Sequence, residues 1–245
     1  MTKKEEKYYK ISAEASRNVS HPAVIAIKET VKTAKKILDL GCGEGMRLGN
    51  LKTSGEKVGV DISDFAINKA RNKYPKAKFI KTDIERLPLK SNSFDLVYSM
   101  FVIEHVAAPE KVLKEAVRVL RKSGTLILGA PNYGAPNRRS PNSKENKLAK
   151  LIKGFFHKTS NNSLGWTKVK PTKGEYFIDA DTQVEPYIET LVKFLQNLGL
   201  KIVRVSSLWE IDDFSVKQFA FRVLGSLKIP PFVYWGPQIF VIAKK

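Results

Sequence analysis

Residues 36–45 read KILDLGCGEG, a short apolar run that ends in three alternating glycines. The run 36–40 has the length and composition of a buried β-strand, and a helical segment is predicted after Gly45. Glycine adopts backbone conformations that other residues avoid, so Gly41, Gly43 and Gly45 predict a tight turn between strand and helix. A strand, a glycine turn and a helix form the opening unit of a doubly wound α/β sheet.

The same alternation continues along the chain. Strands are predicted at 36–40, 57–60, 77–80, 94–98, 125–129, 201–205 and 238–243. Helices are predicted at 22–33, 46–52, 64–73, 109–120 and 184–198. Strands that alternate with helices indicate a mainly parallel, seven-stranded, Rossmann-like sheet covered on both faces, which is a doubly wound α/β fold.

Length and composition bound the architecture and the setting. A chain of 245 residues with 42% hydrophobic and 27% charged residues fits one globular α/β domain, here 1–245. The single cysteine, Cys42, cannot form an internal disulfide, and no cysteine set suits a metal. We therefore expect a cytoplasmic protein without a bound metal. Neither a secretory signal nor a membrane-spanning segment is recognised in the sequence.

Residues 131–180 break the regular alternation after the fifth predicted strand. They are rich in proline, asparagine and serine, and 138–173 contain ten Lys or Arg against one acid, Glu145. A long segment after a strand's carboxyl end lies beside the crevice where doubly wound sheets bind ligands. We expect an inserted substrate cap here, with a solvated surface loop as the alternative. Residues 138–173 thus carry nine of the nineteen net positive charges, which favours contact with polyanions or anionic lipid.

The spacing of the glycines indicates the kind of cofactor. A dinucleotide fingerprint, G-x-G-x-x-G, would need glycine where Met46 stands, and the Gly-Lys-Ser/Thr ending of a P-loop is missing. Asp39 at the end of the first strand would repel a pyrophosphate but attract the ammonium or sulfonium of an amino-acid-bearing cofactor. The sequence therefore favours a cationic cofactor over a dinucleotide or a nucleoside triphosphate.

Two further acids follow the next two predicted strands. Asp61 can accept the hydroxyl protons of a ribose, while Asp83 can accept a hydrogen bond from an adenine amino group, with Ile84 covering the ring. Each of these acids has an alternative role as a helix cap or turn residue. Acids at the ends of three consecutive strands nevertheless favour a nucleoside site.

Four segments then resemble one known family. ILDLGCGEG (37–45), VGVDIS (58–63), TDIERLPLKSNSFDLVYSMFVIEHV (82–106) and EAVRVLRKSGTLILGAPN (115–132) are similar, in order and spacing, to motifs of the class I S-adenosylmethionine-dependent methyltransferases, type 11. The resemblance implies a seven-stranded sheet with an antiparallel last strand and S-adenosyl-L-methionine as cofactor. It also implies these cofactor-binding residues: Asp39, Gly41, Cys42, Gly43 and Gly45 around the methionine part; Asp61 and Ile62 at the ribose; Asp83 and Ile84 at adenine; and Ser99 and Met100 facing the methionine moiety.

Methyl transfer from a sulfonium is an in-line displacement, so catalysis comes mostly from positioning the acceptor. A hydroxyl acceptor must also lose a proton, and His105 after the fourth predicted strand is the candidate general base. The alternative is a structural or cofactor-contacting histidine. The residues at 99–102, SMFV, lack the Asn/Asp-Pro-Pro-Tyr/Phe pattern of methyltransferases that modify base amines, and no Pro-Cys pair supports cytosine C5 chemistry.

Several hypotheses for the acceptor stay open. The leading one is a small-molecule or lipid-linked acceptor, walled by four aromatic residues of the cap: Tyr133, Phe155, Phe156 and Trp166. The second is an RNA substrate held by the basic cap residues Arg138, Arg139, Lys144, Lys147, Lys150 and Lys153. The third is a non-catalytic binding protein that keeps the fold. Residues 148–156, LAKLIKGFF, would also suit peripheral contact with an anionic membrane.

Overall fold

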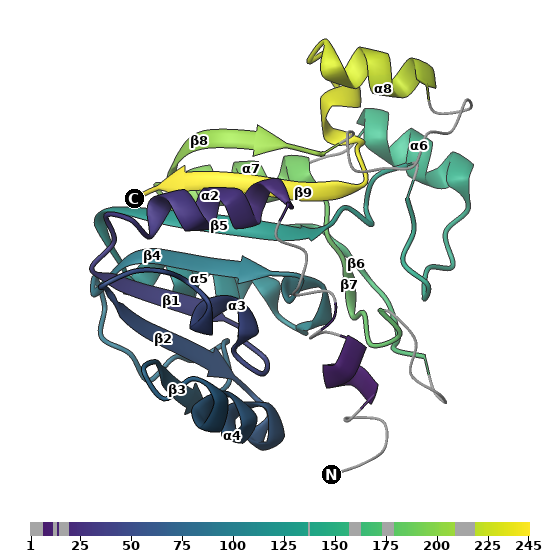
Figure 1. Ribbon diagram of the computed structural model, residues 1–245. Helices are drawn as coiled ribbons and strands as arrows, with labels where there is room; N and C mark the ends of the chain where they lie inside the picture. The colour runs from purple at the N-terminus through teal and green to yellow at the C-terminus, as the bar shows by residue number, and fades with distance from the viewer. Residues whose placement is uncertain are drawn as a thin grey trace.

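The computed structural model describes residues 7–11, 14, 20–136, 138–156, 163–172, 179–208 and 219–245, and its centre is one seven-stranded sheet (Figure 1). The strand order is β3-β2-β1-β4-β5-β9-β8. The strands are β1 (Lys36–Leu40), β2 (Glu56–Asp61), β3 (Lys78–Lys81), β4 (Phe94–Met100), β5 (Leu120–Pro131), β8 (Lys201–Ser206) and β9 (Gln238–Lys244). The first five pair in parallel, and β9 runs antiparallel to both of its neighbours, β5 and β8. The predicted fold class is confirmed, including the antiparallel last strand.

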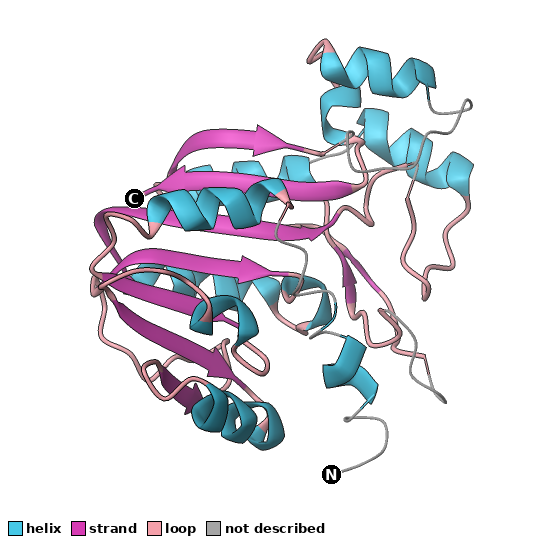
Figure 2. Ribbon diagram, in the orientation of Figure 1, coloured by secondary structure: helices cyan, strands magenta, loops and turns pink. Residues whose placement is uncertain are grey.

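Helices cover both faces of this sheet (Figure 2). One face packs against α2 (Pro22–Thr30), α3 (Met46–Gly49) and α4 (Asp64–Lys73), and the other against α5 (Pro109–Val119) and α7 (Ile188–Asn197). The apolar side chains of each layer form one buried cluster, so the strands of the central sheet are buried on both sides. This arrangement leaves the carboxyl edge of the parallel strands as the place for a binding site.

The helix predicted before the sixth predicted strand has different bounds in the structure. The prediction of a helix at 184–198 is wrong at its start, because Val184–Glu185 form β7, which pairs with β6 (Thr167–Lys168) in a separate two-stranded sheet. Proline disfavours helical backbone at the preceding residue, so Pro186 keeps Glu185 extended and delays the helix to Ile188.

A third layer of structure lies beyond the carboxyl ends of the parallel strands. It contains α6 (Lys147–Phe156), the two-stranded sheet, α8 (Phe219–Ser226) and the 3-10 helix η4 (Phe232–Tyr234). Trp235, which is 1% exposed, is the centre of a small cluster that joins the residues after β5 to those before β9. Trp166 packs against the same cluster and donates a hydrogen bond to Thr190 Oγ1 at 2.9 Å.

A buried ion pair fixes α6 to the strand that precedes α7. Lys150 Nζ lies 2.9 Å from Glu185 Oε2, and both side chains are 1% exposed. The ammonium also donates hydrogen bonds to the carbonyl oxygens of Tyr133 and Arg138, and Ser140 Oγ donates to Glu185 Oε1 at 2.9 Å. The expectation that Lys150 contacts RNA is therefore wrong, because its side chain is buried and its charge is paired with Glu185.

For this ion pair we expect that removing one charge destabilises the protein more than removing both. Glu185→Gln leaves the Lys150 ammonium buried without its counter-charge, and we expect it to lower the free energy of unfolding by about 3–5 kcal/mol. The double substitution Lys150→Met with Glu185→Leu removes both charges and should cost clearly less. Urea unfolding of the three proteins measures this difference.

The exposed pair of Lys32 and Glu29 supplies the control. Glu29→Gln should change the free energy of unfolding by less than about 1 kcal/mol, because both side chains are more than half exposed. A Glu185→Gln protein as stable as this control would show that the buried pair is not an anchor of the cap.

Candidate functional site

The described residues enclose a cavity of about 700 Å³ at the carboxyl edge of β1, β2 and β4. Its floor comes from the segments that follow four parallel strands, at 41–47, 61–63, 83–85 and 100–107. Four residues from distant parts of the chain complete the wall: Tyr8, Tyr9, Asp181 and Gln183. The cavity therefore lies in the crevice where doubly wound sheets bind ligands.

The glycine loop after β1 shapes one side of the cavity. Gly41, Gly43 and Gly45 have φ angles of 73°, 52° and 74°, in the left-handed region that side chains disfavour. A Cβ atom on Gly41 would lie 2.5 Å from the side chain of Val102, so the loop and the segment after β4 meet closely. At Gly43 a Cβ would meet nothing within 4 Å, so this residue presents bare backbone toward open space.

Asp61 fastens this loop to the end of β2. Its carboxylate accepts hydrogen bonds from the backbone nitrogens of Gly43 at 2.9 Å and Ser63 at 3.0 Å. The hydroxyl of Tyr9 donates to the same carboxylate at 3.3 Å, which brings the segment 7–11 across the cavity. Asp61 is 8% exposed and lines the cavity, where a bound hydroxyl group could replace the Tyr9 hydroxyl.

Three of the predicted cofactor residues lie behind the cavity wall. Asp39 is 1% exposed and accepts a hydrogen bond from Tyr98 Oη at 2.9 Å. Burial raises the pKa of Asp39 to about 7, although the nearby Arg47 guanidinium and the Tyr98 hydrogen bond oppose the rise. Ser99 Oγ donates to the Leu40 carbonyl oxygen at 3.1 Å, and Gly45 is the N-cap of α3. Asp39, Ser99 and Gly45 therefore hold the residues of the cavity wall in place and do not line the cavity themselves.

The other predicted cofactor residues line the cavity. Ile62 is 68% exposed, whereas Ile84 and Met100 are almost fully buried. Asp83 Oδ1 accepts the backbone N–H of Glu85 at 2.8 Å, which is the turn geometry that the sequence left as its alternative role. Burial raises the pKa of the Cys42 thiol, so this residue acts as a small wall residue rather than as a nucleophile.

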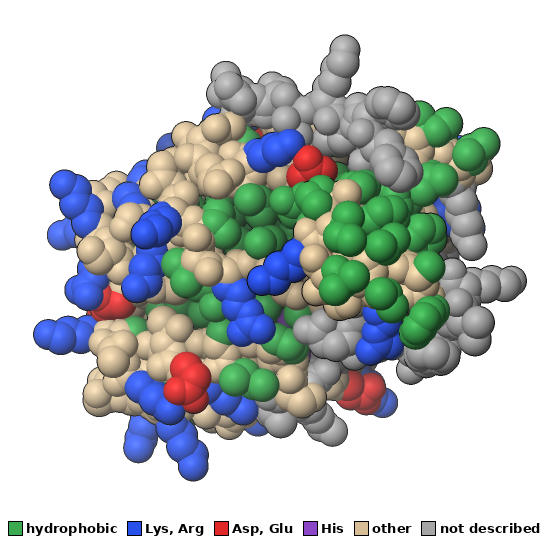
Figure 3. Space-filling model, turned by 90° about the horizontal axis from the view of Figure 1, so that it is seen from above, with side chains coloured by type: hydrophobic (Ala, Val, Ile, Leu, Met, Phe, Trp, Pro, Cys, Tyr) green, Lys and Arg blue, Asp and Glu red, His purple; other side chains and the backbone are tan. Residues whose placement is uncertain are grey.

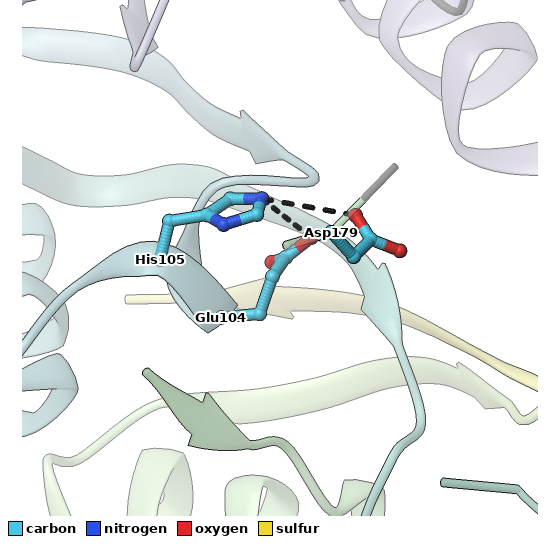
Figure 4. Close-up of side chains that lie close together, drawn as sticks. All are labelled: Glu104, His105 and Asp179. Atoms are coloured by element: carbon cyan, nitrogen blue, oxygen red, sulfur yellow. Dashed lines mark ion pairs between the residues drawn. The ribbon is translucent and has the colours of Figure 1, made fainter. Parts of the chain in front are cut away.

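His105 ends the 3-10 helix η1 (Ile103–His105), and the end of the cap region is docked onto that helix. The backbone N–H of Gln183 donates to the Glu104 carbonyl oxygen at 2.8 Å, and its side-chain amide donates to the His105 carbonyl oxygen at 2.6 Å. These bonds bring two acids to the imidazole: Asp181 Oδ1 lies 3.2 Å from Nδ1, and Asp179 Oδ1 lies 4.0 Å from Nε2. Figure 4 shows Glu104 and Asp179 on the Nε2 side of the ring.

These acids control the charge of the ring. Burial alone would lower the pKa of His105, but the neighbouring carboxylates of Asp181, Glu104 and Asp179 raise it to about 9. Burial raises the pKa of Glu104 to about 7. An imidazolium has no free lone pair, so the surroundings of His105 disfavour the general-base role at neutral pH.

The structure also shows wall residues that the sequence did not reveal. Arg47, in the first turn of α3, lines the cavity, as do Phe101 and Val102 after β4. These residues lie next to the recognised motifs in the sequence, so their positions could have indicated that they line the cavity. Asp181 and Gln183 reach the cavity from the far end of the cap region, and no local pattern marks them. Tyr133 and Trp166, expected to wall an acceptor pocket, do not line this cavity because they pack in the layer beyond it.

Comparison with known proteins agrees with this geometry. A type 11 family described as a methyltransferase domain matches residues 38–128. A probable S-adenosylmethionine-dependent methyltransferase of Mycobacterium tuberculosis is 35% identical over 101 residues, which cover 41% of this chain and 37% of that protein. A ubiquinone/menaquinone biosynthesis C-methyltransferase of Campylobacter jejuni is 34% identical over 106 residues, which cover 40% and 45% respectively. The chain thus matches less than half the length of these relatives.

The solved structures show the same fold over nearly the whole chain. An S-adenosylmethionine-dependent methyltransferase from Mesorhizobium loti superposes with a TM-score of 0.60 at 19% identity, covering 93% of this chain and 100% of that one. The match of residues 38–128 to the model of a methyltransferase domain family agrees with the resemblance that the motifs indicated. The cofactor expected from those motifs, S-adenosyl-L-methionine, is the one that the name of the mycobacterial relative specifies.

The hydrogen bonds of Asp61 yield a binding prediction. Asp61→Ala removes the acceptor that orients the Gly43 N–H, together with the expected ribose contact. Because a hydrogen bond to a charged group contributes about 1.5–3 kcal/mol, we expect S-adenosylhomocysteine to bind at least about tenfold more weakly. Titration calorimetry measures this, and Asp64→Asn, which alters an exposed carboxylate on α4, is the matched control. Equal affinities of the two variants would refute the assignment.

The buried carboxyl of Asp39 yields a prediction about pH. Its folded-state pKa of about 7 lies above the ordinary value of 3.8, so the folded protein holds a proton that the unfolded chain releases. This contribution to stability is fully present below about pH 4 and is lost as the pH rises to about 7. Asp39→Asn lacks it, so the stability of the variant relative to wild type should rise over this range, by on the order of 4 kcal/mol.

Thermal unfolding of both proteins at several pH values, without cofactor, tests this expectation. The other titrating groups contribute equally to both proteins, so their effects cancel in the difference. Parallel stability curves for wild type and Asp39→Asn would show that Asp39 is ionised in the folded protein throughout.

Proposed function

We propose that this chain binds S-adenosyl-L-methionine in the cavity and transfers its methyl group to a small-molecule or lipid-linked acceptor. The observation that carries the proposal is that two distant parts of the chain line the same cavity. The glycine loop and Asp61 form one side, and Asp181 and Gln183 from the end of the cap region form another. A cofactor on the first side would present its methyl group to an acceptor held near the second.

The chemistry asks little of the side chains beyond positioning. The acceptor atom forms a bond to the methyl carbon while the bond from that carbon to sulfur breaks, and sulfur keeps the electron pair. Such a displacement needs the acceptor about 3–3.5 Å from the methyl carbon and in line with sulfur. The fixed glycine loop and the docked cap segment can supply this alignment, with Arg47 available to the carboxylate of the cofactor.

The dimensions and surface of the protein favour a small or lipid-linked acceptor. A volume of about 700 Å³ falls within the range of small-molecule sites. Figure 3 shows hydrophobic side chains gathered on the face where α8 lies, and those exposed on α6, on α8 and just after α8 are Leu148, Ile152, Phe219, Val223, Leu227 and Ile229. The Campylobacter relative is named for a C-methyltransferase of quinone biosynthesis, which supports the same class.

This apolar surface also suits peripheral contact with a membrane. No helix in the described part of the chain has both the length and the apolar character needed to cross a bilayer. A lipid-linked acceptor would then reach the cavity from the membrane surface.

The basic cap gives less support to an RNA substrate than its composition indicated. Lys150 is buried in its ion pair, and Lys153 pairs with Glu145. Arg138 lies over the ring of Tyr133, with 5.4 Å from the guanidinium carbon to the ring centre. Fewer cations of the cap are therefore available to phosphates than the sequence predicted. An RNA substrate and a non-catalytic binding role remain the two outcomes against which the proposal is tested.

The partition of a radiolabelled methyl group tests the proposal. The protein is incubated with labelled S-adenosyl-L-methionine and an extract of its source, and Asp61→Ala is the control for label that other enzymes transfer. We expect label in the organic or small-molecule fraction with the wild-type protein only. Acid-precipitable label that ribonuclease removes would favour RNA. Absence of transfer with intact S-adenosylhomocysteine binding would favour a binding protein.

A further inference from the structure

Glu104 is a buried carboxylate whose oxygens both lack a hydrogen-bond partner among the described residues. Its side chain is fully shielded from solvent, and its nearest charged neighbour is His105 Nε2, 3.7 Å from Oε1. A buried carboxylate without hydrogen bonds is strongly disfavoured unless a cation compensates it. Figure 4 shows it aimed at the space between the imidazole and Asp179. A protonated His105 supplies positive charge beside Glu104 but no hydrogen bond to it, whereas a bound cation would supply both the charge and bonds to the carboxylate.

Three potential metal ligands surround the same space. One oxygen of Glu104, His105 Nε2 and one oxygen of Asp179 all lie within 4.8 Å of one another. Nε2 is 3.7 Å from the first oxygen and 4.0 Å from the second. Ligand bonds of about 2.0–2.2 Å allow two ligand atoms to be up to about 4.4 Å apart. That limit applies to ligands on opposite sides of the ion, and a tetrahedral ion holds its ligand atoms about 3.3–3.6 Å apart. The three ligands must therefore close by a few tenths of an ångström, and Asp179, which is 24% exposed, has room to adjust.

Neighbouring side chains orient two of these potential ligands, His105 and Asp179. Asp181 Oδ1 lies 3.2 Å from His105 Nδ1, which favours the proton on Nδ1 and leaves Nε2 to face the two acids. The hydroxyl of Tyr133 donates to Oδ2 of Asp179, so Oδ1 remains on the side of the imidazole. Metal-binding histidines and carboxylates typically have such hydrogen-bonded partners.

We propose that Glu104, His105 and Asp179 bind a divalent first-row transition-metal ion, such as Mn²⁺ or Zn²⁺, beside the cavity. The ion would replace the proton on His105 Nε2, which is released to solvent, and one imidazole nitrogen with two carboxylate oxygens is a donor set that such ions accept. Three protein ligands leave at least one coordination position for water or another oxygen, and His105 lines the cavity. That position suits an acceptor with a hydroxyl or another oxygen donor, a consequence that rests on the proposed function.

The sequence did not predict this site, because its ligands come from two distant segments. Glu104 and His105 are adjacent on η1, but Asp179 arrives only because Gln183 docks the cap segment on that helix. A glutamate followed by a histidine, with no third potential ligand nearby in the sequence, does not form a recognisable metal-binding motif.

Metal binding to the full chain, freed of metal by a chelator, tests the proposal. Mn²⁺ is added and the free ion is measured by electron paramagnetic resonance, with Zn²⁺ as competitor. We expect one ion per chain in the wild type and in Asp64→Asn, a control carboxylate on the exposed side of α4. Glu104→Gln and Asp179→Asn should each weaken binding at least about tenfold. Absence of stoichiometric binding of both ions, or binding that both variants retain, would overturn the proposal.

Thermal unfolding supplies a readout that does not depend on activity. Mn²⁺ or Zn²⁺ should raise the Tm of the wild type, because a ligand that binds only the folded state stabilises it, and should not raise that of Glu104→Gln. If Glu104→Gln does not fold, the surface-accessible Asp179→Asn carries the test. An equal metal-induced shift in wild type and in the folded variants would contradict the site.

S-adenosylhomocysteine binding, measured on the same samples, separates this proposal from the proposed function. Metal binding without S-adenosylhomocysteine binding would support the metal site while the proposed function failed. S-adenosylhomocysteine binding without metal binding would refute the metal site and leave the methyltransferase proposal intact.

Discussion

The parallel pairing of β1 with both β2 and β4 is the constraint on which the rest of the site depends. Because these strands run in the same direction, their carboxyl ends and the segments that follow them meet at one edge of the sheet. The glycine loop, Asp61 and the 100–107 segment become neighbours for this reason alone. Helices cover both faces of the sheet, and the described residues leave room for a ligand at this edge.

Much of this arrangement could be predicted from local sequence. Apolar runs gave the strands, and the three glycines gave a turn whose left-handed φ angles the structure bears out. Asp61 and Asp83 were visible because acids follow strand ends, and parallel strands bring such ends together. These features depend on short segments whose neighbours are set by fold class, so one sequence is sufficient to find them.

The remainder depends on contacts between distant segments, for which the sequence has no local signal. Lys150 belongs to a lysine-rich run that reads as solvated surface, yet the fold places it beside Glu185 and buries both. Asp181 and Gln183 lie in a loop-rich stretch, and only their docking on η1 makes them part of the cavity. Asp39 was expected to touch the cofactor, but the Tyr98 hydroxyl and the strand itself place it behind the wall. Burial of this kind follows from packing in three dimensions rather than from residue pattern.

The residues that line the cavity carry a net negative charge, whereas the whole chain carries a net positive charge. The chain has a net charge of +19, yet acids line the cavity more often than cations do: Glu44, Asp61, Asp83, Glu85 and Asp181 against Arg47 and His105. A positive exterior attracts anionic surfaces over long range, whereas an acidic interior favours cationic ligands at contact distance. The sulfonium of the proposed cofactor and the proposed divalent ion would each bring positive charge to this interior. The raised pKa of His105 and the buried Glu104 carboxylate, which has no hydrogen-bond partner among the described residues, are two consequences of one property, an excess of carboxylates at this edge of the cavity.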